Sequence, residues 1–341
     1  MNDFSQLGLA APLLRALSDK GYTTPTPIQA QAIPIILGGH DVLGIAATGT
    51  GKTAAFALPI LQKLSTGERE HPKSRKCRAL ILCPTRELAQ QITDNFRRYA
   101  AQGKLRATAL YGGVSFGKQL NEMSGGVDVL IATPGRLMDH MQRGTVDLQS
   151  VGVLVLDEAD HMLDLGFIPA VRRIVRALPR KRQTLMFSAT MPPDIRALAA
   201  DLLTSPQTVS VALQGTAPKK ITQSVVHGDP AAKRAHLTSL LQTRAGARTL
   251  IFTRTKRGAD KVAKDLSISK IPSAAIHGNK SQNQRVRTLD AFRSGRTPVL
   301  VATDIAARGI DIGGIVLVVN YDLPNVPGTY VRRIGRPGRA G

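Results

Sequence analysis

Three segments of this chain recur about 170 residues further along, and this internal repeat limits the folds that the chain can adopt. The paired segments are RALILCPTRELAQQI from Arg78 with RTLIFTRTKRGADKV from Arg248, ALYGGVS from Ala109 with AAIHGNKS from Ala274, and VLIATPGR from Val129 with VLVATDIAAR from Val299. Because the segments keep their order and spacing, the two halves are predicted to be copies of one fold.

Short apolar runs rich in β-branched residues alternate with stretches of helical pattern along the chain. The clearest runs are Arg78–Pro84, Val127–Thr133, Val151–Leu156 and Thr184–Phe187. Such runs are typical of parallel sheets with helices on both faces. At 341 residues the chain exceeds the size at which a single core stops growing, so we expect two α/β domains.

The segment between the two copies, Gln214–Lys220, carries Gly, Pro and Lys without apolar periodicity and is predicted to be an exposed linker. The boundary is expected near Gly215. We therefore predict a first domain over residues 1–214, a linker over 215–220 and a second domain over 221–341.

The chain carries 46 Lys and Arg residues against 24 Asp and Glu, a formal net charge of +22. This charge suits a nucleic acid or an anionic membrane surface, and does not choose between them. No run approaches the ~20 apolar residues that span a bilayer, and Met1–Leu9 lacks the features of a signal peptide. Cys77 and Cys83 have no partners at metal-ligand spacing. We expect a cytoplasmic protein without membrane contacts, and buried thiols in a reducing compartment.

A predicted strand at Asp41–Ala47 is followed by TGTGKT and then by a helix-forming run, Ala54–Leu64. This strand, loop and helix have the pattern of a phosphate-binding loop, although Ala46 stands where the general pattern has its first glycine. Lys52 can reach the β- and γ-phosphates, and the Thr53 hydroxyl can ligate Mg²⁺. The residues predicted to bind ATP here are Ala46, Ala47, Thr48, Gly49, Thr50, Gly51, Lys52 and Thr53.

A second apolar strand, Val151–Leu156, ends directly in the acidic residues Asp157, Glu158 and Asp160. Open α/β sheets bind ligands at the carboxyl ends of their strands. Asp157 is placed to hold Mg²⁺, and Glu158 to deprotonate the attacking water. The alternative interpretation is an ordinary helix cap.

With these motifs in order, the chain resembles the DEAD-box RNA helicases, and its DEADHMLDLGF run, Asp157–Phe167, is most similar to their bacterial RhlE branch. The resemblance covers nearly the whole chain. It implies two tandem RecA-like domains that hydrolyse ATP to ADP and phosphate while they locally unwind or remodel RNA duplexes and RNA–protein complexes. It further implies a monomer, with RNA-processing, RNA-decay or ribosome-assembly proteins as partners.

In that family an isolated aromatic residue and a GFxxPxxIQ segment recognise adenine. The resemblance assigns these roles to Phe4, Tyr22, Thr24 and Gln29. A side-chain amide offers a donor and an acceptor together, so Gln29 is expected to favour ATP over GTP. The alternative is that this proline-rich stretch is a loop capping the sheet.

The resemblance also names residues that couple hydrolysis to strand separation. Ser188 and Thr190 are expected to bond the carboxylate of Asp160, although Ser-Ala-Thr alone would be an ordinary turn. In the second domain, Asp311 is expected to contact the ribose and Arg333 to take part in coupling. Arg336 and Arg339 match the family's arginine fingers, which stabilise the γ-phosphoryl transition state when the domains close. Their alternative role is RNA contact.

RNA contacts are implied at two sets of positions, Thr85, Arg86, Gly112, Gly113, Thr133, Pro134, Gly135 and Arg136 in the first domain, and Thr253, Gln282, Arg285 and Thr303 in the second. Hydroxyls, helix N-termini and arginines bind the phosphate backbone without contacting the bases, so RNA binding is expected to be independent of the nucleotide sequence. The alternative is that the Gly112-Gly113 and TPGR segments form ordinary turns and helix caps. The basic cluster of Arg172, Arg173, Arg176, Arg180, Lys181 and Arg182 is interpreted as a solvated helix face and the turn that follows it, and the alternative is an extension of the RNA surface.

The last motif departs from the family pattern HRIGRTGR, because Arg332 replaces the histidine and Pro337 the threonine. An arginine cannot accept a hydrogen bond, and proline removes an N–H, so interdomain coupling is expected to be weaker. The chain ends at Gly341, and the second sheet is expected to be incomplete. Two alternatives stay open: a non-hydrolysing, ATP-dependent RNA clamp and a DNA helicase of the same superfamily.

Overall fold

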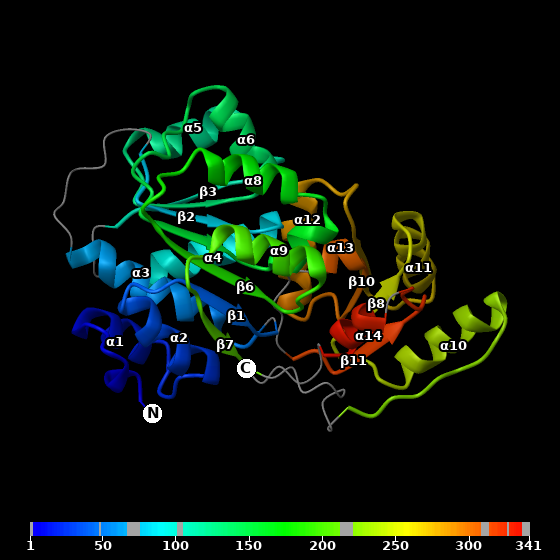
Figure 1. Ribbon diagram of the computed structural model, residues 1–341. Coiled ribbons are helices and arrows are strands. Elements are labelled where there is room, and N and C mark those ends of the chain that lie inside the picture. The colour runs from blue at the N-terminus through cyan, green and yellow to red at the C-terminus, as the bar shows by residue number, and fades with distance from the viewer. Residues whose placement is uncertain are drawn as a thin grey trace. The chain divides into compact units, whose positions relative to one another are not determined.

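The computed structural model describes residues 3–47, 49–66, 76–100, 105–211, 221–307, 314–325 and 327–335. The chain divides into two compact units, Met1–Leu213 and Gln214–Gly341. Each unit contains its own parallel β-sheet flanked by helices (Figure 1). The predicted parallel sheets with helices on both faces are therefore confirmed.

The first unit contains a seven-stranded sheet in which every strand pair is parallel. Its strands are β1 (Val42–Ile45), β2 (Ala79–Leu82), β3 (Ala107–Leu110), β4 (Val129–Ala132), β5 (Val153–Leu156), β6 (Gln183–Ser188) and β7 (Gln207–Ser210). They lie in the order β3-β4-β2-β5-β6-β1-β7. The carboxyl ends of β1 and β5, where the phosphate loop and the acidic motif begin, are thus separated by β6 alone.

Helices cover both faces of this sheet, because alternate strand residues point to opposite sides. Ile81 of β2 belongs to one hydrophobic core and Leu80 and Leu82 to the other. The first core is covered by the short helix η1 (Phe4–Leu7) with α1 (Ala11–Ser18), α2 (Pro27–Leu37), α3 (Lys52–Thr66) and α4 (Arg86–Tyr99). The second is covered by α5 (Phe116–Ser124), α6 (Pro134–Gln142), α7 (Ala159–Asp164), α8 (Ile168–Arg176) and α9 (Pro193–Leu202).

The second unit repeats this plan on a four-stranded parallel sheet in the order β11-β8-β10-β9. Its strands are β8 (Thr249–Thr253), β9 (Ser273–Ile276), β10 (Val299–Thr303) and β11 (Leu317–Asn320). The helices α10 (Pro230–Gln242) and α11 (Lys256–Ile268) pack on one face, whereas α12 (Gln282–Arg293) and α13 (Asp304–Ala307) pack on the other. Helix α14 (Pro327–Ile334) follows β11.

Both cysteines are free thiols in the interior of the first unit, as predicted. Burial raises the pKa of Cys77 to about 12 and that of Cys83 well above its usual value. Thiolates are the reactive form of cysteine, so both side chains act as small apolar groups in the core. Across the ranges that the structure describes, we find no helix with both the length and the apolar composition needed to cross a membrane.

Candidate active site

The phosphate loop joins the end of β1 to the start of α3. Gly49 and Gly51 have φ angles of 84° and 90°, a left-handed conformation that glycine adopts without a Cβ clash. Lys52 is the first residue of α3, is buried, and donates from Nζ to the Ala46 carbonyl oxygen at 3.0 Å. The Thr50 hydroxyl donates to the Ala47 carbonyl at 2.8 Å. The ammonium group is thereby held within the loop. Thr48 lies outside the described residues.

Gln29 connects the predicted adenine-recognition segment to this loop. Its Oε1 accepts from the Thr26 backbone N–H at 2.9 Å, which completes the capping box of α2, and its Nε2 donates to the Gly51 carbonyl at 3.1 Å. A Cβ on Gly51 would lie 2.4 Å from Gln29 Nε2. The absence of a side chain at residue 51 is therefore needed for this contact as well as for the positive φ.

The other predicted adenine residues lie in different surroundings. Phe4 packs into the first hydrophobic core and is 3% exposed, whereas Tyr22 is 48% exposed and Thr24 is also at the surface. Of the four predicted side chains, Gln29 is the one whose contact with the phosphate loop is described.

Asp157 and Glu158 follow β5 and are buried. The pKa of Asp157 is raised to about 6, mainly by burial and also by the nearby Glu158 carboxylate, whereas Lys52 lowers it. The backbone N–H of Glu158 donates to Asp157 Oδ1 at 3.0 Å, and Glu158 has a left-handed φ of 53°. A non-glycine residue in this conformation is uncommon and often marks a functional site. Two carboxyl groups thus meet at the carboxyl edge of the sheet, the region where parallel α/β sheets bind ligands.

Asp160, Ser188 and Thr190 form a hydrogen-bonded group between α7 and the end of β6. Thr190 Oγ1 donates to Asp160 Oδ2 at 2.8 Å, and the Asp160 backbone N–H donates to Ser188 Oγ at 3.2 Å. Ser188 Oγ in turn donates to the Thr190 carbonyl at 2.7 Å. Three of the four residues predicted to take part in coupling, Asp160, Ser188 and Thr190, therefore lie together in the first unit, whereas the fourth, Arg333, belongs to the second.

The predicted RNA residues at the start of α4 lie against the glycine pair of the β3–α5 turn. Thr85 caps α4 by accepting from the Leu88 N–H at 3.2 Å. A Cβ on Gly113 would lie 2.1 Å from an Arg86 guanidinium nitrogen, and one on Gly112 would lie 3.1 Å away. The two glycines therefore make room for the Arg86 guanidinium.

Arg136, near the start of α6, is held by residues that the sequence did not single out. Its Nε donates to Gln119 Oε1 at 2.8 Å, one of its Nη atoms donates to the Val114 carbonyl, and its guanidinium lies 5.4 Å from the Phe116 ring centroid. Gln119 is itself fixed by donating from Nε2 to the Tyr111 carbonyl at 2.9 Å. Thr133, Pro134 and Gly135 form the preceding turn and the first turn of α6.

His140 completes this group from the last turn of α6. Its ring stacks on Phe116 with a centroid distance of 4.1 Å, and its Nε2 lies 3.3 Å from Gln119 Oε1. Burial, together with the positive charges of Arg136 and Arg143, lowers the pKa of His140 to about 4. A ring held neutral can share its environment with two guanidinium groups without charge repulsion.

In the second unit, the internal repeat reveals a residue pair that motif matching missed. Thr255 caps α11 by accepting from the Gly258 N–H at 2.9 Å, as Thr85 caps α4. Lys256 follows it, as Arg86 follows Thr85, and donates from Nζ to Asn279 Oδ1 at 2.9 Å. Lys256 also lies beside Gly278, where Nζ is 3.7 Å from the position of an added Cβ. The aligned segments of the repeat were the signal for this pair.

The remaining predicted RNA residues of the second unit lie at the ends of its strands and at a helix start. Thr253 ends β8 and Thr303 ends β10, and both are buried. Gln282 begins α12, and Arg285 lies in its first turn.

Arg333 lies inside the second unit and is 3% exposed. Its guanidinium donates to both carboxylate oxygens of Asp304 at 2.6 Å, to Asn320 Oδ1 at 2.8 Å and to the Asp322 carbonyl at 2.7 Å. It also lies 4.7 Å from the Phe252 ring centroid. These contacts join α14 to α13 and to the end of β11. Asp311, Arg336, Arg339 and Pro337 lie outside the described residues.

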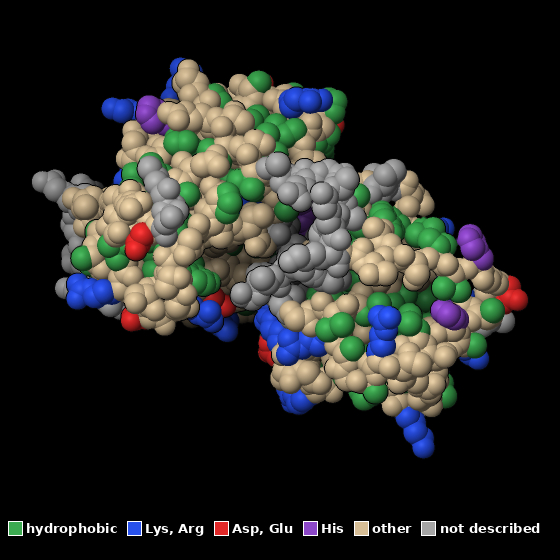
Figure 2. Space-filling model, turned by 90° about the horizontal axis from the view of Figure 1, so that it is seen from below, with side chains coloured by type: hydrophobic (Ala, Val, Ile, Leu, Met, Phe, Trp, Pro, Cys, Tyr) green, Lys and Arg blue, Asp and Glu red, His purple; other side chains and the backbone are tan. Residues whose placement is uncertain are grey.

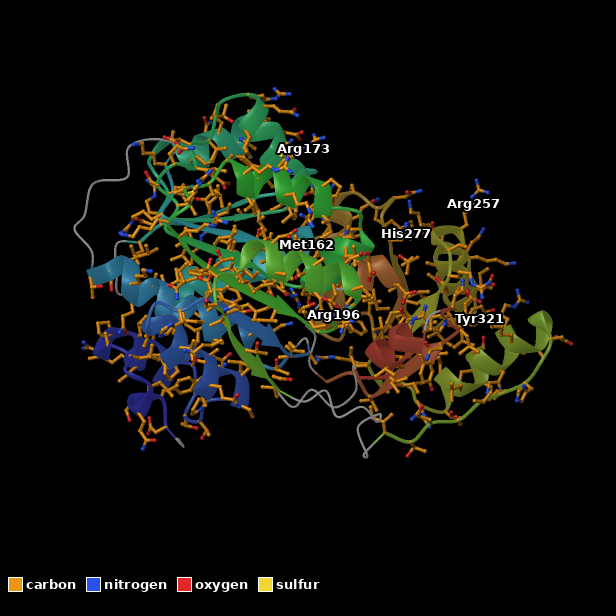
Figure 3. All side chains as sticks on the ribbon, viewed as in Figure 1. Met162, Arg173, Arg196, Arg257, His277 and Tyr321 are labelled. Carbon is orange, nitrogen blue, oxygen red and sulfur yellow. The ribbon has the colours of Figure 1, made fainter. Side chains whose placement is uncertain are left out.

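Basic side chains lie in small groups across the surface shown in Figure 2. On α8, Arg173 and Arg176 are exposed, as is Arg180 beyond its end, and Figure 3 shows Arg173 at the edge of the first unit. Arg172 pairs with Asp201 of α9. Val171, Ile174 and Val175 on the opposite side of α8 are buried, so the cluster lies on a solvated helix face, as interpreted from the sequence.

Comparison with known proteins gives matches over both units. The family model of the DEAD/DEAH box helicases matches residues 26–198, and that of the helicase conserved C-terminal domain matches residues 232–341. DEAD-box ATP-dependent RNA helicases 14 and 46 of Arabidopsis thaliana are 45% and 46% identical over 99% of this chain. The chain spans about half the length of these curated relatives, 55% and 52%.

Solved structures show the same fold. S. cerevisiae Dbp5 bound to RNA and ADP BeF3 is 31% identical, with a TM-score of 0.86 over 99% of this chain and 87% of that chain. A DEAD box protein from the hyperthermophile Methanococcus jannaschii is 35% identical, with a TM-score of 0.59 over 100% of this chain and 90% of that chain. The two parallel-sheet units are RecA-like domains, and the chain belongs to the DEAD-box ATP-dependent RNA helicase family.

Proposed function

We propose that this protein is an RNA-dependent ATPase that locally unwinds or remodels short RNA duplexes and RNA–protein complexes. The observation that carries this proposal is the meeting of the phosphate loop, Gln29 and the acidic motif at one edge of the first sheet. The names of the Arabidopsis relatives, ATP-dependent RNA helicases, support it, as does the RNA and ADP BeF3 complex of Dbp5.

The chemistry follows from the positions of three side chains. Gln29 reads the adenine edge, and the Lys52 ammonium moves from the Ala46 carbonyl to the β- and γ-phosphates. Glu158 accepts a proton from the water whose oxygen attacks the γ-phosphorus. The bond between the γ-phosphorus and the bridging oxygen breaks, and ADP and phosphate leave.

We propose Mg²⁺ as the accompanying ion, because the donor groups fit it. Thr53 offers a hydroxyl and Asp157 a carboxylate, both of them the hard oxygen ligands that Mg²⁺ prefers. Burial raises the pKa of Asp157 although Lys52 lowers it, and a cation bound at this buried carboxylate would favour its charged form. The described residues contain no group of three or more His, Cys, Asp or Glu side chains suited to a metal ion. Such an ion, when bound, would stabilise negative charge on the phosphates.

We assign residues 1–214 to the ATP-binding domain, with its adenine-recognition segment at 2–30, residues 215–220 to a linker and residues 221–341 to the second domain. From the second domain, Asp311 would contact the ribose and Arg336 and Arg339 would stabilise the γ-phosphoryl transition state. ATP and RNA together would close the domains, and hydrolysis would reset them. Thr190 and Asp160 would couple this cycle to strand separation.

RNA binding is proposed to run along the phosphate backbone without base reading. Arg86, Arg136 and Lys256 support this, since each cation lies at a helix start beside a turn. The DEADHMLDLGF run supports placement in the bacterial RhlE branch. A cytoplasmic monomer that works with RNA-processing, RNA-decay or ribosome-assembly proteins is consistent with that placement.

Phosphate release by the purified chain, with and without single-stranded RNA, tests the proposed function. We expect RNA to stimulate turnover, a DNA strand of the same sequence to stimulate it less, and Glu158→Gln to abolish it. ATP-dependent RNA binding without phosphate release would instead identify a clamp. Equal stimulation by DNA would identify a DNA helicase of the same superfamily.

A further inference from the structure

His161 lies in the first turn of α7, and its imidazole contacts the carboxylate of Glu158. The two atoms, His161 Nδ1 and Glu158 Oε2, are 3.2 Å apart, and the side chains are 5% and 8% exposed. We propose that His161 is a positioning residue, which orients the Glu158 carboxylate for proton abstraction from water. This inference rests on the proposed role of Glu158 as the general base.

The hydrogen-bonding chemistry assigns the direction of this contact. An ionised carboxylate only accepts, so Nδ1 must carry the proton and donate it. The other ring nitrogen, Nε2, is buried and has no hydrogen-bond partner among the described residues. A buried N–H without an acceptor is costly, whereas the tautomer with its proton on Nδ1 leaves only a lone pair at Nε2. The surroundings of Nε2 therefore favour the tautomer that can donate to Glu158.

The backbone explains why Glu158 benefits from a side-chain partner. Glu158 sits at the N-cap of α7 in the left-handed region, with φ and ψ both at 53°, and its N–H is bound to Asp157 Oδ1. The main chain is thus fixed at this residue, but the glutamate side chain keeps three torsions of its own. A hydrogen bond at Oε2 restricts those torsions and sets the direction of the carboxylate lone pairs. Proton transfer depends steeply on such alignment.

Two substitutions distinguish the loss of the Nδ1 hydrogen-bond donor from the loss of the volume of the His161 ring. His161→Leu removes the donor and keeps an apolar group of comparable bulk, whereas His161→Asn places a side-chain amide N–H close to the position of Nδ1. At saturating RNA, we expect His161→Leu to lower kcat by about tenfold while the KM for ATP changes by less than about twofold. His161→Asn is expected to restore most of the lost kcat.

Met162 provides a matched control, because it is the next residue of α7 and is fully buried in the second core. Figure 3 shows it within the first unit. Met162→Ala is expected to lower the melting temperature without changing kcat at a temperature where the protein stays folded. If Met162→Ala lowered kcat as much as His161→Leu, or if His161→Asn were as slow as His161→Leu, the positioning role would be overturned.

Glu158→Gln distinguishes failure of this inference from failure of the proposed function. If Glu158→Gln abolishes turnover and His161→Leu retains the wild-type kcat, His161 has no positioning role and Glu158 keeps its own. If Glu158→Gln retains turnover, the general base is elsewhere, and both proposals fail together.

Discussion

Arg333 holds both carboxylate oxygens of Asp304 at 2.6 Å, in a bidentate pair that joins α14 to α13 within the second unit. A further two acceptors, Asn320 Oδ1 and the Asp322 carbonyl, bind the same guanidinium. Any effect of Arg333 on coupling would therefore act through the position of α14. The proposed arginine fingers, Arg336 and Arg339, follow that helix in the sequence.

Replacing Arg333 by lysine is expected to destabilise the second unit by about 3 kcal/mol, because an ammonium group cannot reproduce a buried bidentate pair. Urea unfolding followed by circular dichroism measures this. Arg257→Lys is the matched control, since Arg257 is exposed on α11 (Figure 3) and its replacement should change stability little. Equal stabilities of the two variants would contradict the structural role of Arg333.

Gln29→Glu is expected to raise the KM for ATP by about tenfold and to reduce the preference for ATP over GTP. Glutamate can still accept from the Thr26 N–H, but it cannot donate to the Gly51 carbonyl or to adenine. Steady-state hydrolysis of both nucleotides provides the measurement. Gln31→Ala, an exposed change on the same helix, should leave both values unchanged. An unaltered ATP to GTP ratio in Gln29→Glu would count against adenine recognition by this residue.

Gly113→Ala is expected to weaken single-stranded RNA binding by about tenfold, because the new methyl group would displace the Arg86 guanidinium. The positive φ of 82° adds backbone strain. Fluorescence anisotropy at fixed salt measures the affinity. Gly117→Ala is the control, since an added Cβ there meets nothing within 4 Å. If Arg86→Ala alone leaves the RNA affinity unchanged, displacement of Arg86 is not the cause.

His140 is expected to make the first unit less stable as the pH falls from about 6.5 towards 4. Its pKa in the folded protein is lowered to about 4, so the unfolded chain binds more protons in this window and unfolding is favoured. His140→Asn removes this titration. The difference in unfolding free energy between wild type and His140→Asn should therefore shrink as the pH falls. Denaturant titrations at several pH values test this, and a constant difference would show that His140 does not titrate as described.

Local patterns in the sequence were enough to predict five strands of the first unit, the parallel arrangement of the sheets and the phosphate loop. Apolar runs and glycine spacing involve residues that are close in the sequence, so they indicate local structure without knowledge of the tertiary fold. The contact of Thr190 with Asp160 was also expected, but through the family resemblance, because the two residues are thirty positions apart.

Other parts of the site depended on long-range packing. No local pattern links Gln119 with His140 and Arg136, because they lie on different helices, α5 and α6. Gln29 lies on α2 and Gly51 in the loop before α3, so their contact also depends on tertiary packing. Phe4 is a further example. The family motif predicts that its ring contacts adenine, but only the packing of the first core shows that the ring is buried.

The sequence by itself determined the alternation of strands and helices, the repeat of one fold in two units, and the residue types available for phosphate chemistry. The tertiary structure alone decided which side chains meet, such as His161 with Glu158 and Arg333 with Asp304. The physical reason is that hydrogen bonds and burial depend on distances of a few ångströms between elements, and these are fixed only when helices pack against the finished sheet.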